Sequence, residues 1–123
     1  MKRRETRDAV VHFGSDANLV REAATDSSAV AAPESVASYD EPEADAGSVD
    51  AAGVRLAVCE LSPESGVDPL AAVREALPTV PVLAVVTDAG MIDDALAVGA
   101  ADVFVRRDGV DETTLLARRM DGV

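Results

Sequence analysis

Aromatic residues, cysteine and long apolar runs are all scarce in this chain of 123 residues. Phe, Tyr and Trp together make up 2% of it, so the hydrophobic core has to be built from Val, Leu and Ala. The single cysteine, Cys59, excludes an internal disulfide and is typical of a reducing cytoplasm. No apolar run approaches the roughly 18 residues that a membrane-spanning helix needs, so we expect no membrane span.

Basic residues are outnumbered by acidic ones. The formal net charge is −12, from 23 acidic and 11 basic residues, and Lys2 is the only lysine. A field of this sign repels phosphate backbones and argues against nucleic acid as a partner. The composition favours a haloarchaeal cytoplasm with multimolar salt, because salt screens the repulsion between acidic groups; the alternative is an ordinary acidic protein.

The chain has the length of one domain. Residues 1–8 begin M-K-R-R-E-T-R, without the apolar segment of a signal peptide, and predict a solvated lead-in to a cytoplasmic protein. Residues 9–123 then form the domain itself. Within it, residues 41–53 are acidic and rich in small side chains, which predicts a mobile surface loop.

Short Val-rich runs alternate with stretches in which apolar residues recur at helical spacing. The predicted strands cover residues 9–13, 28–32, 54–58, 80–86 and 102–105. The predicted helices start near residue 17, cover 33–39, 69–77 and 91–98, and follow residue 111. Asp68 before Pro69 is a preferred helix start, and Gly99 is a typical helix end. Right-handed crossovers then give a parallel α/β sheet with helices on both faces.

The third predicted strand lies in V-R-L-A-V-C-E-L-S-P, residues 54–63, and stops at Cys59. In open α/β sheets, ligands bind outside the carboxyl ends of the strands, so Cys59 is a candidate site residue. The turn G-S-D-A-N after the first strand suggests a phosphate-binding turn only weakly, because it lacks the glycine-rich motifs of nucleotide sites. A small-ligand-binding α/β domain is therefore one alternative function.

Four stretches in order are V-V-H-F-G-S-D-A-N, A-V-C-E-L-S-P, V-L-A-V-V-T and G-A-A-D-V-F-V-R. Together they make nearly the whole chain resemble the receiver domain of two-component response regulators. The resemblance implies a CheY-like (flavodoxin-like), doubly wound, five-stranded parallel sheet of order 2-1-3-4-5 with helices on both faces. It also implies a role in phosphorelay signalling, with a histidine kinase, a sensor or another receiver domain as the protein partner.

In that family an aspartate on the third strand accepts the phosphoryl group, and an acidic pair after the first strand helps it to hold Mg²⁺. The resemblance places the acceptor position at Cys59 and the acidic pair at Gly14 and Ser15. Asp16 is one residue further on, and we expect it to cap the first helix instead. The resemblance therefore implies that neither the acceptor nor the metal ligands are present.

The family also uses a hydroxyl residue and a lysine to bind the phosphoryl oxygens, and an aromatic residue on the fifth strand. Thr87 retains the hydroxyl, Arg106 replaces the lysine, and Val103 replaces the aromatic, while Phe104 faces the opposite way. The implied protein is a degenerate receiver. It is not phosphorylated, it has no metal or cofactor, it is not an enzyme, and it acts through protein contacts.

Two alternatives concern the third strand. A shift by one residue would place Glu60 at the acceptor position, where its charge would face Arg106 and mimic an activated state. Cys59 near Arg106 could instead be a redox or thiol-sensing site, since positive neighbours favour the thiolate. Glu60 opposes that effect, no second cysteine is present, and His12 on the first strand is more typical of a packed side chain.

The last predicted helix offers a surface for self-association. Its residues Leu115, Leu116 and Met120 lie on one face, and the same helix carries the Arg118–Arg119 pair. This face could form a weak homodimer. The alternative is that the three apolar side chains belong to the core, which is the commoner arrangement for such a stripe.

Overall fold

The structure is a computed structural model that describes residues 10–26, 36–49, 54–106 and 112–122. It contains one parallel sheet of order β2-β1-β3-β4-β5. The strands are β1 (Val10–Phe13), β2 (Val36–Tyr39), β3 (Leu56–Leu61), β4 (Val82–Val86) and β5 (Asp102–Val105). The helices are α1 (Ala17–Asp26), α2 (Pro42–Asp45), α3 (Asp68–Ala76), α4 (Ile92–Val98) and α5 (Glu112–Gly122). Two short 3₁₀ turns, η2 (Ala46–Ser48) and η4 (Ala89–Met91), precede β3 and α4.

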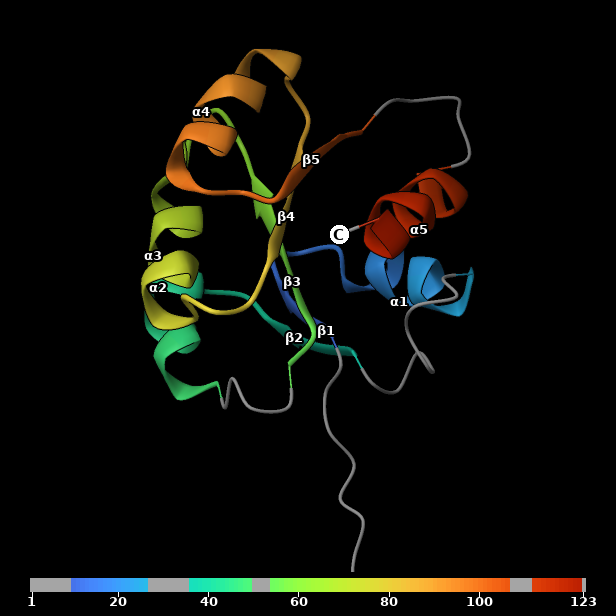
Figure 1. The fold of residues 1–123 in the computed structure, drawn as a ribbon, viewed down its shortest axis with the longest axis horizontal. Coiled ribbons are helices and arrows are strands. Elements are labelled where there is room, and N and C mark those ends of the chain that lie inside the picture. The colour runs from blue at the N-terminus through green and yellow to red at the C-terminus, as the bar shows by residue number, and fades with distance from the viewer. Residues whose placement is uncertain (1–9, 27–35, 50–53, 107–111, 123) are drawn as a thin grey trace, which may run out of the picture.

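The helices form a layer on each face of the sheet, with α1 and α5 on one side and α2, α3 and α4 on the other (Figure 1). Each layer has its own core. Leu19, Val58 and Leu116 lie in the core under α1 and α5. Phe13 and Leu70 lie in the core under α2, α3 and α4. The predicted fold class, strand order and two-sided helical cover are therefore confirmed.

The predicted helix over 33–39 was wrong for its described part, because Val36–Tyr39 is the edge strand β2. Its residues pair in register with β1, from Val10 opposite Val36 to Phe13 opposite Tyr39. Val and Tyr favour strands, and this preference together with the pairing outweighs the helix signal of the preceding proline. The strand predicted over 28–32 lies outside the described residues.

The predicted loop over 41–53 contains regular structure in its described part. Pro42 occupies the first turn of α2, where its missing N–H costs nothing. Ala46, at the start of η2, is 2% exposed and packs into the core on that face. The small residues that suggested a loop therefore allow close packing instead. Residues 50–53, like the lead-in 1–8, lie outside the described part.

The third strand is displaced from its predicted position. It begins at Leu56 and continues past Cys59 to Leu61, so the expectation that Glu60 lies just beyond the strand was wrong. Glu60 pairs with Val85 and Leu61 with Val86, and the Leu61 side chain is buried. This pairing with β4 carries the strand on until Pro63 ends it.

Other predicted boundaries lie within two residues of the observed ones. β5 has its predicted bounds, and β4 begins two residues late, at Val82. α3 begins at Asp68 itself, and Gly99 ends α4 in a left-handed conformation with φ 117°. The predicted cap at residue 111 lies outside the described residues. No helix in the described part of the chain is long and apolar enough to cross a membrane.

Candidate functional site

A cleft of about 560 Å³ opens at the carboxyl edge of the sheet. The loop after β1 contributes Gly14 and Ser15 to its lining, β3 contributes Glu60, and Thr87 and Arg106 follow β4 and β5. Segments far apart in the sequence meet here because the carboxyl ends of parallel strands share one edge. The structure thus brings together five of the residues singled out in the sequence.

Cys59 lies apart from this group. Successive residues of a strand face opposite sides of the sheet. The Cys59 side chain is 0% exposed and lies in the core with Phe13 and Leu61, on the side of α2, α3 and α4. Glu60 points the other way and lines the cleft. Beside Leu61, β3 therefore presents the Glu60 carboxylate to the cleft and not the Cys59 thiol.

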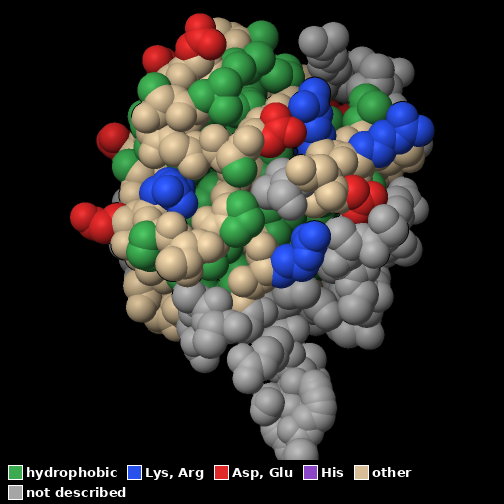
Figure 2. Space-filling model, viewed as in Figure 1, with side chains coloured by type: hydrophobic (Ala, Val, Ile, Leu, Met, Phe, Trp, Pro, Cys, Tyr) green, Lys and Arg blue, Asp and Glu red, His purple; other side chains and the backbone are tan. Residues whose placement is uncertain are grey.

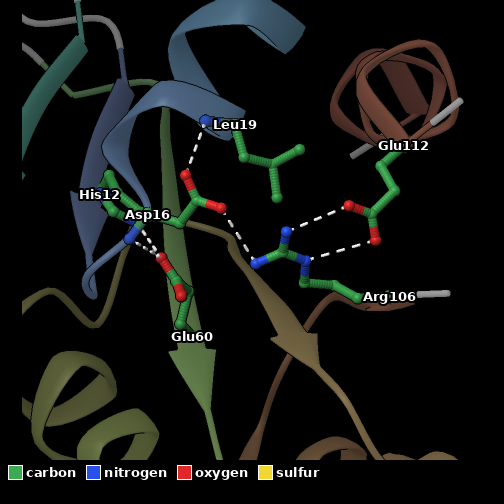
Figure 3. A network of polar contacts seen from close by, with 6 residues as sticks. All are labelled: His12, Asp16, Leu19, Glu60, Arg106 and Glu112. Atoms are coloured by element: carbon green, nitrogen blue, oxygen red, sulfur yellow. Dashed lines mark hydrogen bonds and ion pairs between the residues drawn. The ribbon is translucent and has the colours of Figure 1, made fainter. Parts of the chain in front are cut away.

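Glu60 is held by two hydrogen bonds to one of its oxygens (Figure 3). Its Oε2 accepts from His12 Nε2 at 2.5 Å and from the backbone N–H of Asp16 at 2.9 Å. His12 is fully buried, and its Nδ1 lies 3.0 Å from the hydroxyl of Ser38 on β2. Because a carboxylate only accepts, Nε2 carries a proton. The Ser38 hydroxyl can either donate to Nδ1 or accept from it, so it suits both a neutral and a protonated ring.

The electrostatics of this cluster favour an ionised Glu60. Burial raises the pKa of Glu60, but the hydrogen bonds from His12 and the Asp16 N–H outweigh that effect, so the pKa lies below its ordinary value. The group is therefore a carboxylate at neutral pH. His12 and the Asp16 N–H compensate this buried negative charge locally.

Gly14 makes room for Glu60. Its φ of +153° is unfavourable for residues with a side chain, and an added Cβ would lie 2.5 Å from the Glu60 carboxyl carbon and Oε2. Its N–H donates to the Tyr39 carbonyl at 2.9 Å, which fixes the turn after β1 against β2. The Glu60 carboxyl group therefore occupies the space that a side chain at position 14 would need.

Arg106 connects the ends of three elements. Its Nη1 lies 3.1 Å from Asp16 Oδ2, and its Nη2 and Nε donate to the two oxygens of Glu112 at 3.1 and 3.3 Å. The hydrogen bond to Glu112, against a smaller effect of burial, raises the pKa of Arg106 above its ordinary value. As predicted, Asp16 also caps α1, since its Oδ1 accepts from the Leu19 N–H at 3.2 Å.

This pairing differs from the sequence hypothesis in which Glu60 faces Arg106. The ion pairs of Arg106 in the described residues are with Asp16 and Glu112, while Glu60 pairs with His12. An arrangement in which Glu60 mimics a phosphoryl group by binding Arg106 is therefore not observed.

Thr87 and Val103 are the two other positions taken from the resemblance. Thr87 is exposed at the rim of the cleft, just after β4. Val103 is buried in the core of α2, α3 and α4, and Phe104 is buried in the opposite core, as the alternation of the strand predicted. At the position to which the resemblance assigns the aromatic residue, the side chain is thus a buried Val.

The residues at this edge do not fit a Mg²⁺ site of the receiver kind. Gly14 and Ser15 offer no carboxylate. Asp16 is engaged with Arg106 and with the helix cap, and Glu60 Oε2 is engaged with His12. Mg²⁺ prefers one or two accessible carboxylates with several waters. Of the carboxylates that follow β1 or lie on β3, Asp16 and Glu60 thus already serve other partners, and the two other acidic residues that line the cleft, Asp40 and Glu41, follow β2 instead.

Two residues of this site, Ser38 and Glu112, were not predicted from the sequence. His12 was noted there, but its contact with Glu60 was not predicted. A usable signal for His12 exists only once the register is known. His12 pairs with Val58, so Glu60, two residues further on, lies on the same face as His12. Ser38 and Glu112 give no comparable signal, because their roles depend on where β2 and α5 begin.

Comparisons with known proteins agree with this geometry at the level of the fold. No family model matches the chain, and no curated protein matches its sequence. A crystal structure of the phosphorylated cyanobacterial phytochrome response regulator RcpA matches with a TM-score of 0.62 and 14% identity, over 93% of this chain and 89% of that one. The chain has the CheY-like receiver fold.

A second solved structure supports the same fold. It is a putative CpaE2 pilus assembly protein from Sinorhizobium meliloti, with a TM-score of 0.55 and 20% identity, over 93% of this chain and 98% of that one. Both likenesses cover 93% of this chain, so the predicted receiver-like architecture is confirmed. At these identities, the chemistry of the receiver edge has to be read from the residues of this chain.

Proposed function

We propose that this receiver-fold domain is a signalling module that acts through protein contacts, without aspartyl phosphorylation and without catalysis. The observation that carries the proposal is the occupation of the acceptor edge by an internal network. Glu60, the carboxylate that β3 presents there, is bound by His12 and by the Asp16 N–H. Receiver phosphorylation needs an accessible aspartate nucleophile and a bound Mg²⁺.

The state of Arg106 supports the same proposal. In receivers the equivalent lysine pairs with the phosphoryl group, whereas Arg106 already makes ion pairs with Asp16 and Glu112. Recruiting Arg106 to a phosphoryl group would break a two-pronged contact with Glu112. The network is thus arranged to hold the edge together and not to respond to phosphate.

The likeness to response regulators supports a protein as the partner, such as a histidine kinase, a sensor or another receiver domain. A weak homodimer of this chain is the other candidate contact. A groove of about 430 Å³ between α4, β5 and α5 is one place for such a contact. Leu115 lines it and is 42% exposed, whereas Leu116 and Met120 are buried in the core. Figure 2 shows hydrophobic side chains gathered over α4, where Leu96 is 46% exposed.

A titration with Mg²⁺ and beryllofluoride, followed by amide NMR, tests the absence of phosphorylation. Beryllofluoride binds as a phosphoryl mimic only where an acceptor carboxylate and Mg²⁺ are available. We expect no saturable shift at Glu60, Thr87 or Arg106. A saturable, Mg²⁺-dependent shift that disappears in Thr87→Ala would overturn the proposal. Sizing and light scattering, with pull-down of the full chain, test the module role: a strict monomer with no partner argues against it.

We also propose that the protein works in a salt-rich cytoplasm, on the basis of its net charge of −12. Concentrated salt shortens the range of repulsion between surface carboxylates to about 3 Å. The thermal midpoint should therefore rise steadily as KCl is raised from about 0.1 M to about 2 M. A midpoint that does not change over this range would argue for an ordinary acidic protein.

A further inference from the structure

A continuous chain of polar contacts crosses the carboxyl edge of the sheet, from the edge strand β2 to the start of α5. Figure 3 shows this chain from His12 to Glu112. Its members, in order, are Ser38, His12, Glu60, Asp16, Arg106 and Glu112. Each comes from a different element or loop. The chain therefore links, through side chains, parts of the fold that are not neighbours in the sequence.

Glu60 is the member on which the others depend most. A single oxygen, Oε2, accepts both the His12 Nε2–H and the Asp16 N–H. Hydrogen bonds to an ionised acceptor are roughly twice as strong as those between neutral groups. A proton added to this carboxylate therefore weakens the contact to β1 and the contact to the β1–α1 loop together.

Asp16 links the β1–α1 loop to α5 through Arg106. Glu60 holds its backbone, and its two carboxylate oxygens bind the Leu19 N–H and Arg106. Arg106 in turn holds both oxygens of Glu112, the first residue of α5. Movement of the Asp16 backbone therefore changes the place that Arg106 can occupy, and with it the anchor of α5.

The charged groups around Glu60 come from several elements. His12 faces it from β1, and Asp16 from the β1–α1 loop. On β4 its partner in the ladder is Val85, which is apolar and buried. The cleft that Glu60 lines also contains Arg106 and two acidic residues that follow β2, Asp40 and Glu41. Beyond Asp16, the adjoining groove is lined by Glu22 of α1 together with Arg106 and Glu112. Of the groups that contact the Glu60 carboxylate, the one able to carry positive charge is thus His12, on the buried side.

We propose that Glu60 is a proton-operated latch, which holds the β1–α1 loop and the start of α5 together when ionised and releases them when protonated. This inference rests on the proposed function, because the latch controls the positions of loops at the carboxyl edge of the sheet, the edge where phosphorylation acts in receivers. With the pKa of Glu60 below its ordinary value, the latch is closed at neutral pH and opens in acid.

An NMR titration of the full chain, from about pH 7 to about pH 3, brackets the ordinary glutamate range and tests the latch. It follows the Glu60 carboxyl carbon, the Asp16 amide and the Arg106 Nε–H. We expect all three signals to move with one shared midpoint. Separate midpoints for Glu60 and the Asp16 amide would overturn the proposal, and this comparison needs no variant.

Asp16 and Glu112 also carry carboxyl groups close to these reporters, so a variant has to separate their effect from that of Glu60. In Glu60→Gln the Asp16 amide and the Arg106 Nε–H should be displaced already at neutral pH and should lose the shared step. Persistence of that step in Glu60→Gln would show that it belongs to Asp16 or Glu112, and the latch would be ruled out.

Asp93→Asn, at an exposed position on α4, is the matched control and should leave all three midpoints unchanged. The two proposals fail separately. A Mg²⁺-dependent beryllofluoride shift contradicts the proposed function but leaves these midpoints as they are, whereas split midpoints contradict only the latch.

Discussion

The polar chain at the carboxyl edge has a buried half and a solvent-facing half with similar chemistry. In the buried half, His12 is 0% exposed and the Glu60 side chain 18%. In the outer half, the side chains of Arg106, Asp16 and Glu112 are 28%, 36% and 21% exposed. Water therefore competes more for the contacts of Arg106 than for the contact to His12, which is fully buried. Removing a hydrogen-bond partner should therefore lower the unfolding free energy most in the buried half, where water cannot replace that partner.

Replacing Glu60 tests the buried half and should have the largest effect. Glu60→Ala leaves the His12 Nε2–H buried and the Asp16 N–H without its acceptor, so unfolding free energy should fall by about 3 kcal/mol. Urea unfolding measures this change. Glu75→Ala, on the exposed face of α3, is the control and should stay within about 0.5 kcal/mol. A loss below about 1 kcal/mol would show that the buried half is not the stronger one.

Gly14→Ala acts on the same cluster by crowding. It should lower the unfolding free energy by about 2 kcal/mol, because it strains the backbone and displaces Glu60. In the Glu60→Ala background the second cause disappears, so a double-mutant cycle should show a coupling of about 1 kcal/mol. Gly47→Ala is the control, because an added Cβ there meets nothing within 4 Å. Equal costs in both backgrounds would contradict the close approach of Gly14 and Glu60.

The pH dependence of stability separates the two halves further. The pKa of Glu60 is lower in the folded chain than its ordinary value, so its contribution is complete above that ordinary value and is lost as pH falls through the folded pKa. The difference in unfolding free energy between wild type and Glu60→Gln should therefore shrink in acid. Urea unfolding at about pH 7 and about pH 3.5 measures it. A difference that stays constant would mean that the carboxylate charge contributes nothing.

The fold was predictable because each element carries its own signal. Short Val-rich strands alternate with amphipathic helices, and the right-handed crossover rule leaves few topologies. The weak points were short elements. V-A-S-Y has too few residues to show a period, and α2 and η2 lie within a stretch whose composition resembles a loop.

The site was less predictable, for a reason of register. The sequence predicted that the third strand stops at Cys59, but β3 runs on to Leu61. A difference of one residue reverses the face of a strand side chain, which decides between thiol and carboxylate. Pairing such as that of Glu60 with His12 depends on two strands being aligned, and the sequence alone does not give that alignment.

The burial of Cys59 gives a further prediction, about the face opposite Glu60. Because the thiol is 0% exposed in the core, iodoacetamide should label it only in unfolded protein, at any pH where the fold persists. Mass spectrometry with and without urea measures the labelling. Rapid labelling of the folded chain would revive the thiol-sensing alternative and would show that the two faces of β3 differ less than the structure indicates.

The smallest effects are expected in the solvent-facing half. Arg106→Gln removes two ion pairs, but the carboxylates of those pairs regain water. The unfolding free energy should therefore fall by about 1 kcal/mol. Arg119→Gln removes a more exposed pair, with Asp102, in which the arginine side chain is 54% exposed, and should cost at most about 0.3 kcal/mol. Concentrated salt should reduce the Arg106 loss but leave the Glu60 loss nearly unchanged, because buried groups are screened much less. If salt reduces both losses equally, the two halves share one electrostatic environment and the distinction between them fails.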